Sequence, residues 1–191
     1  MRTLLIIVLF SIYITSCKSK PEKNTKTETT TIETKISNED HKAYINVVLN
    51  PKNESNVNGK VRFIQSEDVV KMTAKISGLS KGVHAIHIHE KSDCTAPDGT
   101  SAGGHWNPTA QPHGKWGAET GYHKGDIGNF NVENDEIITF KFSTNEWCIG
   151  CGDKTKDIIG KGIIIHQGED DFVSQPSGAA GSRVSCAGII K

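Results

Sequence analysis

The stretch His84-Ala85-Ile86-His87-Ile88-His89 places three histidines among small and branched apolar residues. Its alternating character predicts a β-strand, on which side chains two positions apart share a face. His87 and His89 therefore point to one side. His84 points to the other side, where we expect it to pack or to form hydrogen bonds. A His-x-His pair on a strand is a weak metal signal by itself, because buried polar pairs also occur without a metal.

Other parts of the chain repeat this strand pattern. Segments with a period of two occupy residues 43–49, 59–65, 70–76, 126–132, 137–142, 163–166 and 186–190. Seven or eight short strands separated by turn residues predict an all-β fold, an antiparallel sandwich or barrel. Two stretches, about 91–124 and 170–183, lack strand character. Long irregular loops in a compact domain are usually functional, so we expect the chemistry there.

The remaining histidines strengthen the metal hypothesis. One loop supplies three histidines and is followed by a carboxylate, a complete tetrahedral set for zinc: His105, His113, His123 and Asp126. His166 ends another strand-like segment and joins His87 and His89 in an all-imidazole set, the ligand type that copper favours. So many candidate ligands in one small domain predict a transition-metal site rather than a collection of structural histidines.

The N-terminal residues have the features of an export signal. Met1-Arg2 supplies positive charge, and the apolar run Leu4–Tyr13 is shorter than the roughly 20 residues of a membrane-spanning helix. The ending Ile14-Thr15-Ser16-Cys17 resembles a bacterial lipobox. We expect residues 1–16 to be cleaved and Cys17 to be lipidated, which anchors the protein to a bacterial membrane on the periplasmic side. The alternative is an ordinary cleaved signal that happens to carry a cysteine.

Composition limits the rest of the chain. Residues 17–40 are mostly Thr, Lys, Glu and Ser, which predicts a disordered tether after the lipidated cysteine. Residues 41–191 are of a length typical of one domain. The charge is balanced at 22 basic and 22 acidic residues without a basic cluster, so nucleic-acid binding is excluded.

Four motifs resemble those of the copper/zinc superoxide dismutases, specifically the exported bacterial form, and follow one another in the same order as in that family. They are Gly82–Glu90, Ser101–Pro108, Gly125–Asn129 and Gly181–Ile190. The resemblance extends over essentially the whole domain. It implies a Greek-key, eight-stranded antiparallel sandwich or flattened barrel with long metal-binding loops, in agreement with the strand pattern.

Position by position, the resemblance also implies a site with one copper and one zinc ion per chain. The implied copper ligands are His87, His89, His105 and His166, and the implied zinc ligands are His105, His113, His123 and Asp126. His105 is shared by the two metals as an imidazolate. Asp170 takes the place of a carboxylate that joins a copper histidine to a zinc histidine, and Arg183 takes the place of the arginine that guides the substrate.

The implied reaction is the conversion of superoxide to dioxygen and hydrogen peroxide by Cu(II)/Cu(I) cycling, with His105 and Arg183 as catalytic residues. Two alternatives on the same fold stay open: a non-catalytic copper-binding or copper-delivery lipoprotein, and a copper-only dismutase. The complete zinc set argues against the second. A homodimer also stays open, because bacterial relatives include monomers and dimers.

The other four cysteines are Cys94, Cys148, Cys151 and Cys186. The resemblance implies a disulfide between Cys94 and Cys186, which the oxidising compartment reached by an exported protein would permit. Cys148 and Cys151 form a Cys-x-x-Cys that departs from the family pattern. We expect a small second disulfide, with a Cu(I) acquisition site as the alternative, because paired thiolates select Cu(I). A redox-exchange role lacks the surrounding βαβ pattern.

Overall fold

The computed structural model describes residues 43–134 and 137–191. The predicted signal peptide at 1–16, Cys17 and the predicted tether at 17–40 lie outside the described residues. Among the described residues, regular structure is almost entirely β, and the only helical piece is one short 3-10 turn. No helix in this part of the chain is long and apolar enough to cross a membrane.

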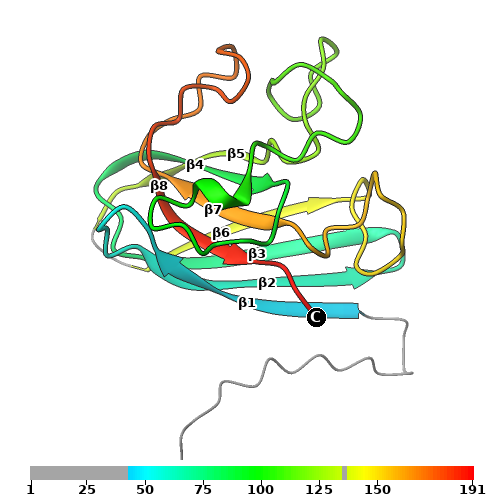
Figure 1. Cartoon of the computed structure of the whole chain (residues 1–191), viewed down its shortest axis with the longest axis horizontal. Helices are drawn as coiled ribbons and strands as arrows, with labels where there is room; N and C mark the ends of the chain where they lie inside the picture. Colours follow the sequence, from blue (N-terminus) through cyan, green and yellow to red (C-terminus); the bar gives the residue numbers. More distant parts are fainter. Residues whose placement is uncertain (1–42, 135–136) are drawn as a thin grey trace, which may run out of the picture. The chain divides into compact units, whose positions relative to one another are not determined.

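Eight strands form the domain (Figure 1). They are β1 (Ala43–Pro51), β2 (Asn58–Ser66), β3 (Val69–Ser77), β4 (Gly82–His89), β5 (Gly128–Val132), β6 (Ile138–Thr144), β7 (Gly162–His166) and β8 (Arg183–Gly188), with the 3-10 turn η1 at Thr100–Ala102. Every strand pairing is antiparallel, in the order β5-β4-β7-β8-β1-β2-β3-β6.

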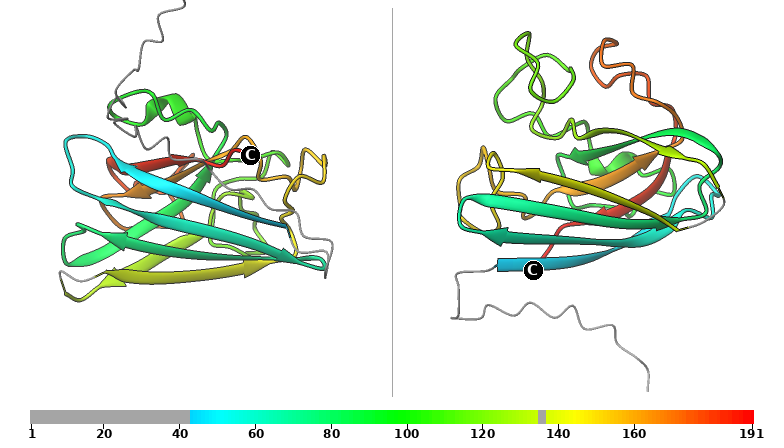
Figure 2. Two further views of the ribbon diagram at one scale, coloured as in Figure 1. Left: turned by 90° about the horizontal axis from the view of Figure 1, so that it is seen from below. Right: turned by 180° about the vertical axis from the view of Figure 1, so that it is seen from behind.

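The sheet consists of two four-stranded halves, β1-β2-β3-β6 and β5-β4-β7-β8. The halves join through only two residue pairs between β1 and β8, Asn50 with Cys186 and Pro51 with Ser185. The chain passes from one half to the other between β3 and β4, between β5 and β6, and between β6 and β7 (Figure 2). Such crossings are typical of Greek-key sandwiches. The predicted all-β, eight-stranded antiparallel fold is therefore confirmed.

Alternating burial builds the core between the halves. In β3, Met72 and Ile76 are buried, while Lys71 and Lys75 point outward to solvent. Complete burial of an apolar side chain of this size stabilises the fold by about 1.5–3 kcal/mol. The segment after β6 adds Trp147, which is 1% exposed and therefore a full member of this core.

Three long segments without strands connect β4 to β5, β6 to β7 and β7 to β8: 90–127, 145–161 and 167–182. The first and last match the two predicted loops, and Figure 1 shows parts of both (green, and orange to red) on the same side of the strands. The strand pattern did not single out 145–161 as a third such segment. Its apolar residues, Trp147 among them, anchor an irregular chain to the core rather than form a strand.

Two strand boundaries were predicted incorrectly. The segment 126–132 was expected to be a strand throughout, but β5 starts only at Gly128, because the Asp126 side chain is held by histidines of the preceding loop. The last strand was expected at 186–190, but β8 runs from Arg183 to Gly188. Beyond Gly188 the chain turns to Lys161, whose carbonyl accepts a hydrogen bond from Ile189 N at 2.8 Å.

Candidate metal centre

Backbone hydrogen bonds join the first long loop to the end of β4. Strand β5 covers β4 only as far as Ile86, so the next residues have a free edge. There Trp106 N donates to Ile88 O at 2.8 Å, and Ile88 N donates to Gly125 O at 2.9 Å. A Cβ on Gly125 would lie 2.1 Å from Ile88 O, so only glycine permits this approach. This junction holds the loop histidines against the strand histidines.

The four predicted copper ligands lie together and are all buried. Their ligand atoms lie within 4.8 Å of one another in the group His87, His89, His105 and His166. The ring centroids of His87 and His105 are 4.0 Å apart, and the Nε2 atoms of His89 and His166 are 3.4 Å apart. Strand parity therefore correctly paired His87 with His89.

The four predicted zinc ligands form a second buried group around one carboxylate. The Asp126 Oδ1 atom lies 2.8 Å from His105 Nδ1 and 3.2 Å from His123 Nδ1, and Oδ2 lies 2.9 Å from His113 Nδ1. The carboxylate is also oriented by the backbone, because Oδ2 accepts a hydrogen bond from His123 N at 2.8 Å. His105 belongs to both groups, as the resemblance implied.

Unpaired ring nitrogens indicate that both groups fit a metal ion. Among the described residues, four buried imidazole nitrogens make no hydrogen bond: His87 Nδ1, His105 Nε2, His113 Nδ1 and His123 Nδ1. The last two lie beside the Asp126 carboxylate as ion-pair contacts only. A buried polar atom without a partner costs about 1–3 kcal/mol, so four in one place need a compensating ligand. An N₃O set fits zinc and an N₄ set fits copper.

Asp170 connects the two groups through the Nε2 atom of one histidine from each. Its Oδ2 lies 2.8 Å from His87 Nε2, and its Oδ1 lies 2.8 Å from His113 Nε2. Because each ring donates its Nε2 proton to this carboxylate, the Nδ1 atom of each ring is left free for a metal. Gly178, at φ +72°, packs against this contact, and a Cβ there would lie 1.8 Å from Asp170 Oδ1. The structure thus places Asp170 between one histidine of the predicted copper group and one histidine of the predicted zinc group.

Burial and charge set the protonation of the histidines in the metal-free protein. Burial, together with neighbouring imidazoles, holds the pKa of His89 and of His166 well below the ordinary range. Burial likewise lowers the pKa of His105 to about 4, against the opposing effect of Asp126. These rings are therefore neutral at pH 7, the form that binds metals.

The pKa of His113 is raised rather than lowered. Burial disfavours its charged form, but the neighbouring carboxylates of Asp126 and Asp170 raise its pKa to about 9. The pKa of each of these two carboxyl groups lies far below its usual value, because hydrogen bonds from the histidines outweigh burial. A metal ion bound at the predicted zinc group would therefore displace a proton from His113 at neutral pH.

A pocket of about 440 Å³ opens over the copper group, and Arg183 lines it together with His89, His105 and His166. Arg183 Nη1 donates to Gly99 O and Nη2 donates to Gly103 O, both at 2.7 Å. The guanidinium is thus fixed by the same loop that carries His105. Burial lowers the pKa of this group from its ordinary value.

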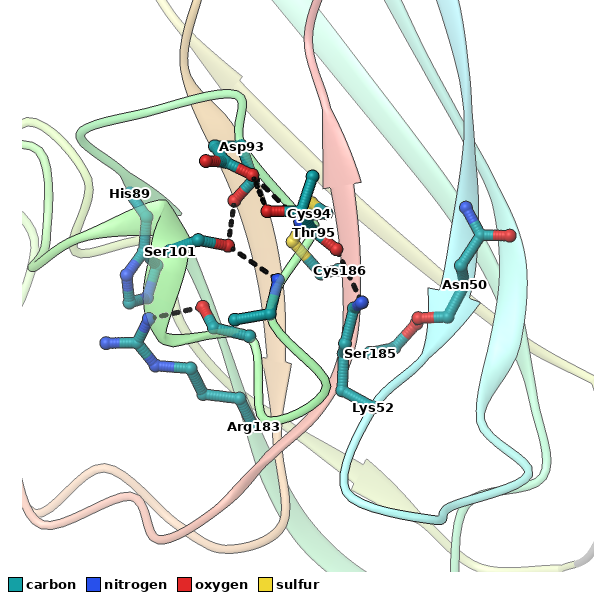
Figure 3. Close-up of a disulfide and its surroundings, with 12 residues drawn as sticks. Asn50, Lys52, His89, Asp93, Cys94, Thr95, Ser101, Arg183, Ser185 and Cys186 are labelled. Carbon is teal, nitrogen blue, oxygen red and sulfur yellow. Dashed lines mark hydrogen bonds between the residues drawn. A yellow bond between two sulfur atoms is a disulfide. The ribbon is translucent and has the colours of Figure 1, made fainter.

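A disulfide between Cys94 and Cys186, with 5.9 Å between the Cα atoms, ties this loop to β8 (Figure 3). Lys52 Nζ also donates a hydrogen bond to Cys94 O. Arg183 and Cys186 both belong to β8, so one strand holds both the arginine and the anchor of the loop that orients it (Figure 3). Cys148 and Cys151 form a second disulfide in the 145–161 segment.

His84 lies outside both metal groups, as its strand parity predicted. It is buried, with Nδ1 at 3.1 Å from His166 O and Nε2 at 2.9 Å from Ser80 O. Through the first contact it supports the backbone of His166, a predicted copper ligand, without belonging to either group.

One residue of the site was missed from the sequence. Gln175 Oε1 accepts a hydrogen bond from His113 N at 2.9 Å, and Gln175 Nε2 donates to His113 O at 2.9 Å. The only sequence signal was its place in the second strand-free loop, because a single glutamine carries no motif.

Comparisons with known proteins agree with this geometry. The family model for copper/zinc superoxide dismutase (SODC) matches residues 57–189. The superoxide dismutase [Cu-Zn] 1 of Aquifex aeolicus is 33% identical over 147 residues, which cover 75% of this chain and 85% of the relative. The copper chaperone for superoxide dismutase of Rattus norvegicus is 35% identical over 141 residues, which cover 70% of this chain. The match spans about half of that chaperone, 48% of its length.

The fold also matches a solved structure. A crystal structure of a double mutant of a SOD-like protein from Bacillus subtilis superposes with a TM-score of 0.68 and 31% identity, covering 76% of this chain and 97% of that one. The match of the family model over most of the domain, the bacterial relatives and the shared fold establish that the chain belongs to the copper/zinc superoxide dismutase family.

Proposed function

We propose that this protein is a superoxide dismutase with one copper and one zinc ion per chain. The observation that carries the proposal is the pair of complete ligand sets that share His105, with Arg183 in the pocket over the copper set. Copper, when bound, supplies one-electron redox chemistry, and zinc supplies a redox-silent charge that holds the shared ring.

His105 is the residue best placed to handle a proton. Its Nδ1 faces Asp126, whereas its Nε2 belongs to the copper group and has no hydrogen-bond partner in the described part of the chain. His105 also lines the pocket, so Nε2 can hold a proton and deliver it to a small anion there. Superoxide needs protons to leave as hydrogen peroxide, and this ring nitrogen would supply one of them.

Arg183 is placed to bind and orient that anion. A guanidinium has five N–H donors, and two of its nitrogens are already fixed on Gly99 O and Gly103 O. The remaining donors are available to superoxide beside the copper ligands. Because the chain has no net charge, attraction of the anion depends on this local positive charge rather than on the whole protein.

Copper delivery is the second candidate, because copper chaperones for superoxide dismutase of rat and mouse match this chain at 35% identity. The two functions place different demands on the site. Delivery needs copper to leave readily, whereas dismutation needs a retained copper together with a proton donor and an anion-binding group. The buried four-histidine set and Arg183 favour dismutation.

The test uses a soluble chain starting at Lys18, in which copper and zinc are quantified and superoxide loss is followed. We expect one copper and one zinc per chain and rapid superoxide loss, which His105→Ala reduces to near background. Activity of His105→Ala close to the unmodified protein would refute the shared-ligand role. A copper-loaded protein with no activity that passes its copper to a metal-free acceptor would favour delivery.

We also propose that the protein is exported and held on a bacterial membrane through a lipid on Cys17, facing the periplasm. The charged start, short apolar run and lipobox-like ending support this, together with the two disulfides, which persist in oxidising compartments. The expected consequence is that Cys17→Ser moves the protein from the membrane fraction to the soluble fraction. An unchanged membrane fraction would contradict lipid anchoring at this residue.

A further inference from the structure

The segment 145–161, between β6 and β7, contains chemistry that dismutation does not use. Cys148 is 6% exposed, Cys151 is exposed to solvent, and a disulfide joins them. We propose that reduction of this disulfide creates a third metal site, in which the two thiolates and the Asp157 carboxylate bind a zinc-type divalent cation. This site is separate from the two histidine groups and does not depend on the proposed activity.

The donor set is suited to such a cation. The sulfur atoms of Cys148 and Cys151 and a carboxylate oxygen of Asp157 lie within 4.8 Å of one another. Two cysteines separated by two residues have the ligand spacing common in zinc sites, where Asp oxygens also serve as ligands. Three protein ligands leave a fourth tetrahedral position for water, and the exposure of Cys151 opens the site to solvent.

The carboxylate of Asp157 organises the cysteine loop. Its Oδ1 accepts hydrogen bonds from Gly150 N at 2.9 Å and Ile159 N at 3.0 Å, and its Oδ2 accepts one from Gly152 N at 3.0 Å. Each carboxylate oxygen has two lone pairs, so Oδ2 keeps one for a metal ion. Gly150 and Gly152, at φ +71° and +77°, adopt the left-handed backbone that lets their N–H groups converge on this carboxylate.

Backbone contacts hold the same loop without help from the disulfide. Cys148 N donates to Lys156 O at 2.8 Å, and Ile158 N donates to Cys148 O at 3.1 Å. Ile149 N donates to Gln65 Oε1 at 2.7 Å, which ties the loop to β2. A bridge between cysteines only three positions apart removes little chain entropy, so it adds little to this framework. The two thiols therefore stay close together after reduction.

The reduction step consumes a thiol or phosphine reductant; a phosphine becomes its oxide by taking the oxygen of a water molecule, and the two cysteines become thiols. With a dithiol, one reductant thiolate attacks the exposed Cys151 sulfur, the S–S bond breaks, and Cys148 leaves as a thiolate. The second reductant thiol then attacks the mixed disulfide, releases Cys151 as a thiolate and leaves the reductant oxidised to its own disulfide. The cation binds these two thiolates in place of the protons that they would otherwise carry.

The probe is Co(II), because a sulfur-to-cobalt charge-transfer band cannot arise from the histidine groups, which contain no sulfur. The histidine sites of the full chain are first filled with Zn(II), excess metal is removed, and a phosphine reduces the protein before Co(II) is titrated. We expect one additional Co(II) per chain with this band. Alkylation and mass spectrometry on the same sample identify which cysteines became thiols.

Four variants test whether the band comes from these three ligands. Cys148→Ser and Cys151→Ser should each abolish the band, even if Cys94 and Cys186 are also reduced. Asp157→Asn should weaken Co(II) binding by about tenfold or more. Asp153→Asn is the matched control, because this exposed carboxylate caps Thr155 in the same loop and lies outside the donor group.

Several results would overturn the proposal. These are a Cys148–Cys151 disulfide that resists the phosphine while the chain is folded, a reduced protein without the band, and a band that survives Cys148→Ser. Unchanged affinity in Asp157→Asn would also overturn it, because that result describes a two-thiolate site of the Cu(I) type rather than a site that uses the carboxylate.

Discussion

Gln175 holds the backbone of His113 through two hydrogen bonds, accepting from its N and donating to its O, both at 2.9 Å. The ring of the same histidine lies between Asp126 and Asp170. His113 belongs to the first long loop. Gln175 of the second long loop therefore holds its backbone, and Asp170 of the same loop holds its ring together with Asp126. The two loops form one unit around this histidine.

Replacement of Gln175 by alanine should weaken zinc binding by about 10–100-fold, the usual effect of removing a partner that orients a metal ligand. Copper affinity should change much less, because the side chain bonds to the backbone of His113 and Val173. Competition with a chromophoric chelator measures both affinities. Gln111→Ala is the matched control on the first loop, since its side chain makes only a 3.4 Å contact to Thr109 O. Equal zinc affinity in Gln175→Ala and Gln111→Ala would contradict the orienting role.

Replacement of Arg183 by glutamine should slow superoxide loss by about tenfold or more, because it removes the positive charge that attracts the anion. The dependence of the rate on ionic strength should flatten as well. Copper and zinc content should stay unchanged, because Arg183 is not a ligand. Arg62→Gln on β2, where the guanidinium lies over Tyr44, provides a control of equal charge change. A rate equal to that of this control would remove Arg183 from the mechanism.

Replacement of Cys186 by serine opens a bridge between residues 92 positions apart in the chain. The chain-entropy treatment of disulfides gives a loss of about 4–5 kcal/mol in the free energy of unfolding for a loop of that length. The short Cys148–Cys151 bridge should cost clearly less in a Cys148→Ser, Cys151→Ser variant. Urea unfolding of the metal-free proteins compares the two. Equal losses would indicate that loop length does not govern the effect.

The metal-free protein should lose stability as the pH falls from about 6.5 toward 4.5, because His89, His105 and His166 have lowered pKa values in the fold. In this range the unfolded chain takes up protons that the folded chain does not, so acid favours unfolding. His113, with its pKa raised to about 9, contributes stability that is fully present below 6.5 and is lost as the pH rises through 9. The titration of His113 therefore does not change how stability depends on pH below 6.5.

Urea midpoints at pH 7 and pH 4.5 measure this effect. Bound zinc and copper should raise both midpoints without removing the pH dependence, because metal-bound imidazoles also take up no protons while the unfolded chain does. A midpoint independent of pH in the metal-free protein would contradict neutral buried histidines.

Local patterns in the chain were sufficient to predict the strands and the metal-ligand candidates. The period-two alternation located all eight strands, and the parity of His84 against His87 and His89 assigned their faces correctly. Such patterns could not predict the register of strand pairing or the irregularities in it. The shift between Ile165 and His166, which places Arg183 opposite His166, depends on how β7 pairs with β8 across the sheet.

Partners that come from distant loops were equally hidden. Gln175 contacts His113 across 62 positions of sequence, and no local periodicity encodes that contact. Gly178, with its left-handed backbone, is a similar case. A side chain there would collide with the Asp170 carboxylate, and local sequence does not reveal that contact.

Because four buried imidazole nitrogens make no hydrogen bond, we expect metal binding to be coupled to the folding of this chain. An ion that binds only the folded chain adds stability that grows with the logarithm of its free concentration, about 2.7 kcal/mol at one hundred times the dissociation constant. The melting temperature is therefore not a fixed property of this sequence. We expect it to rise with the available zinc and copper and to fall when a chelator removes them.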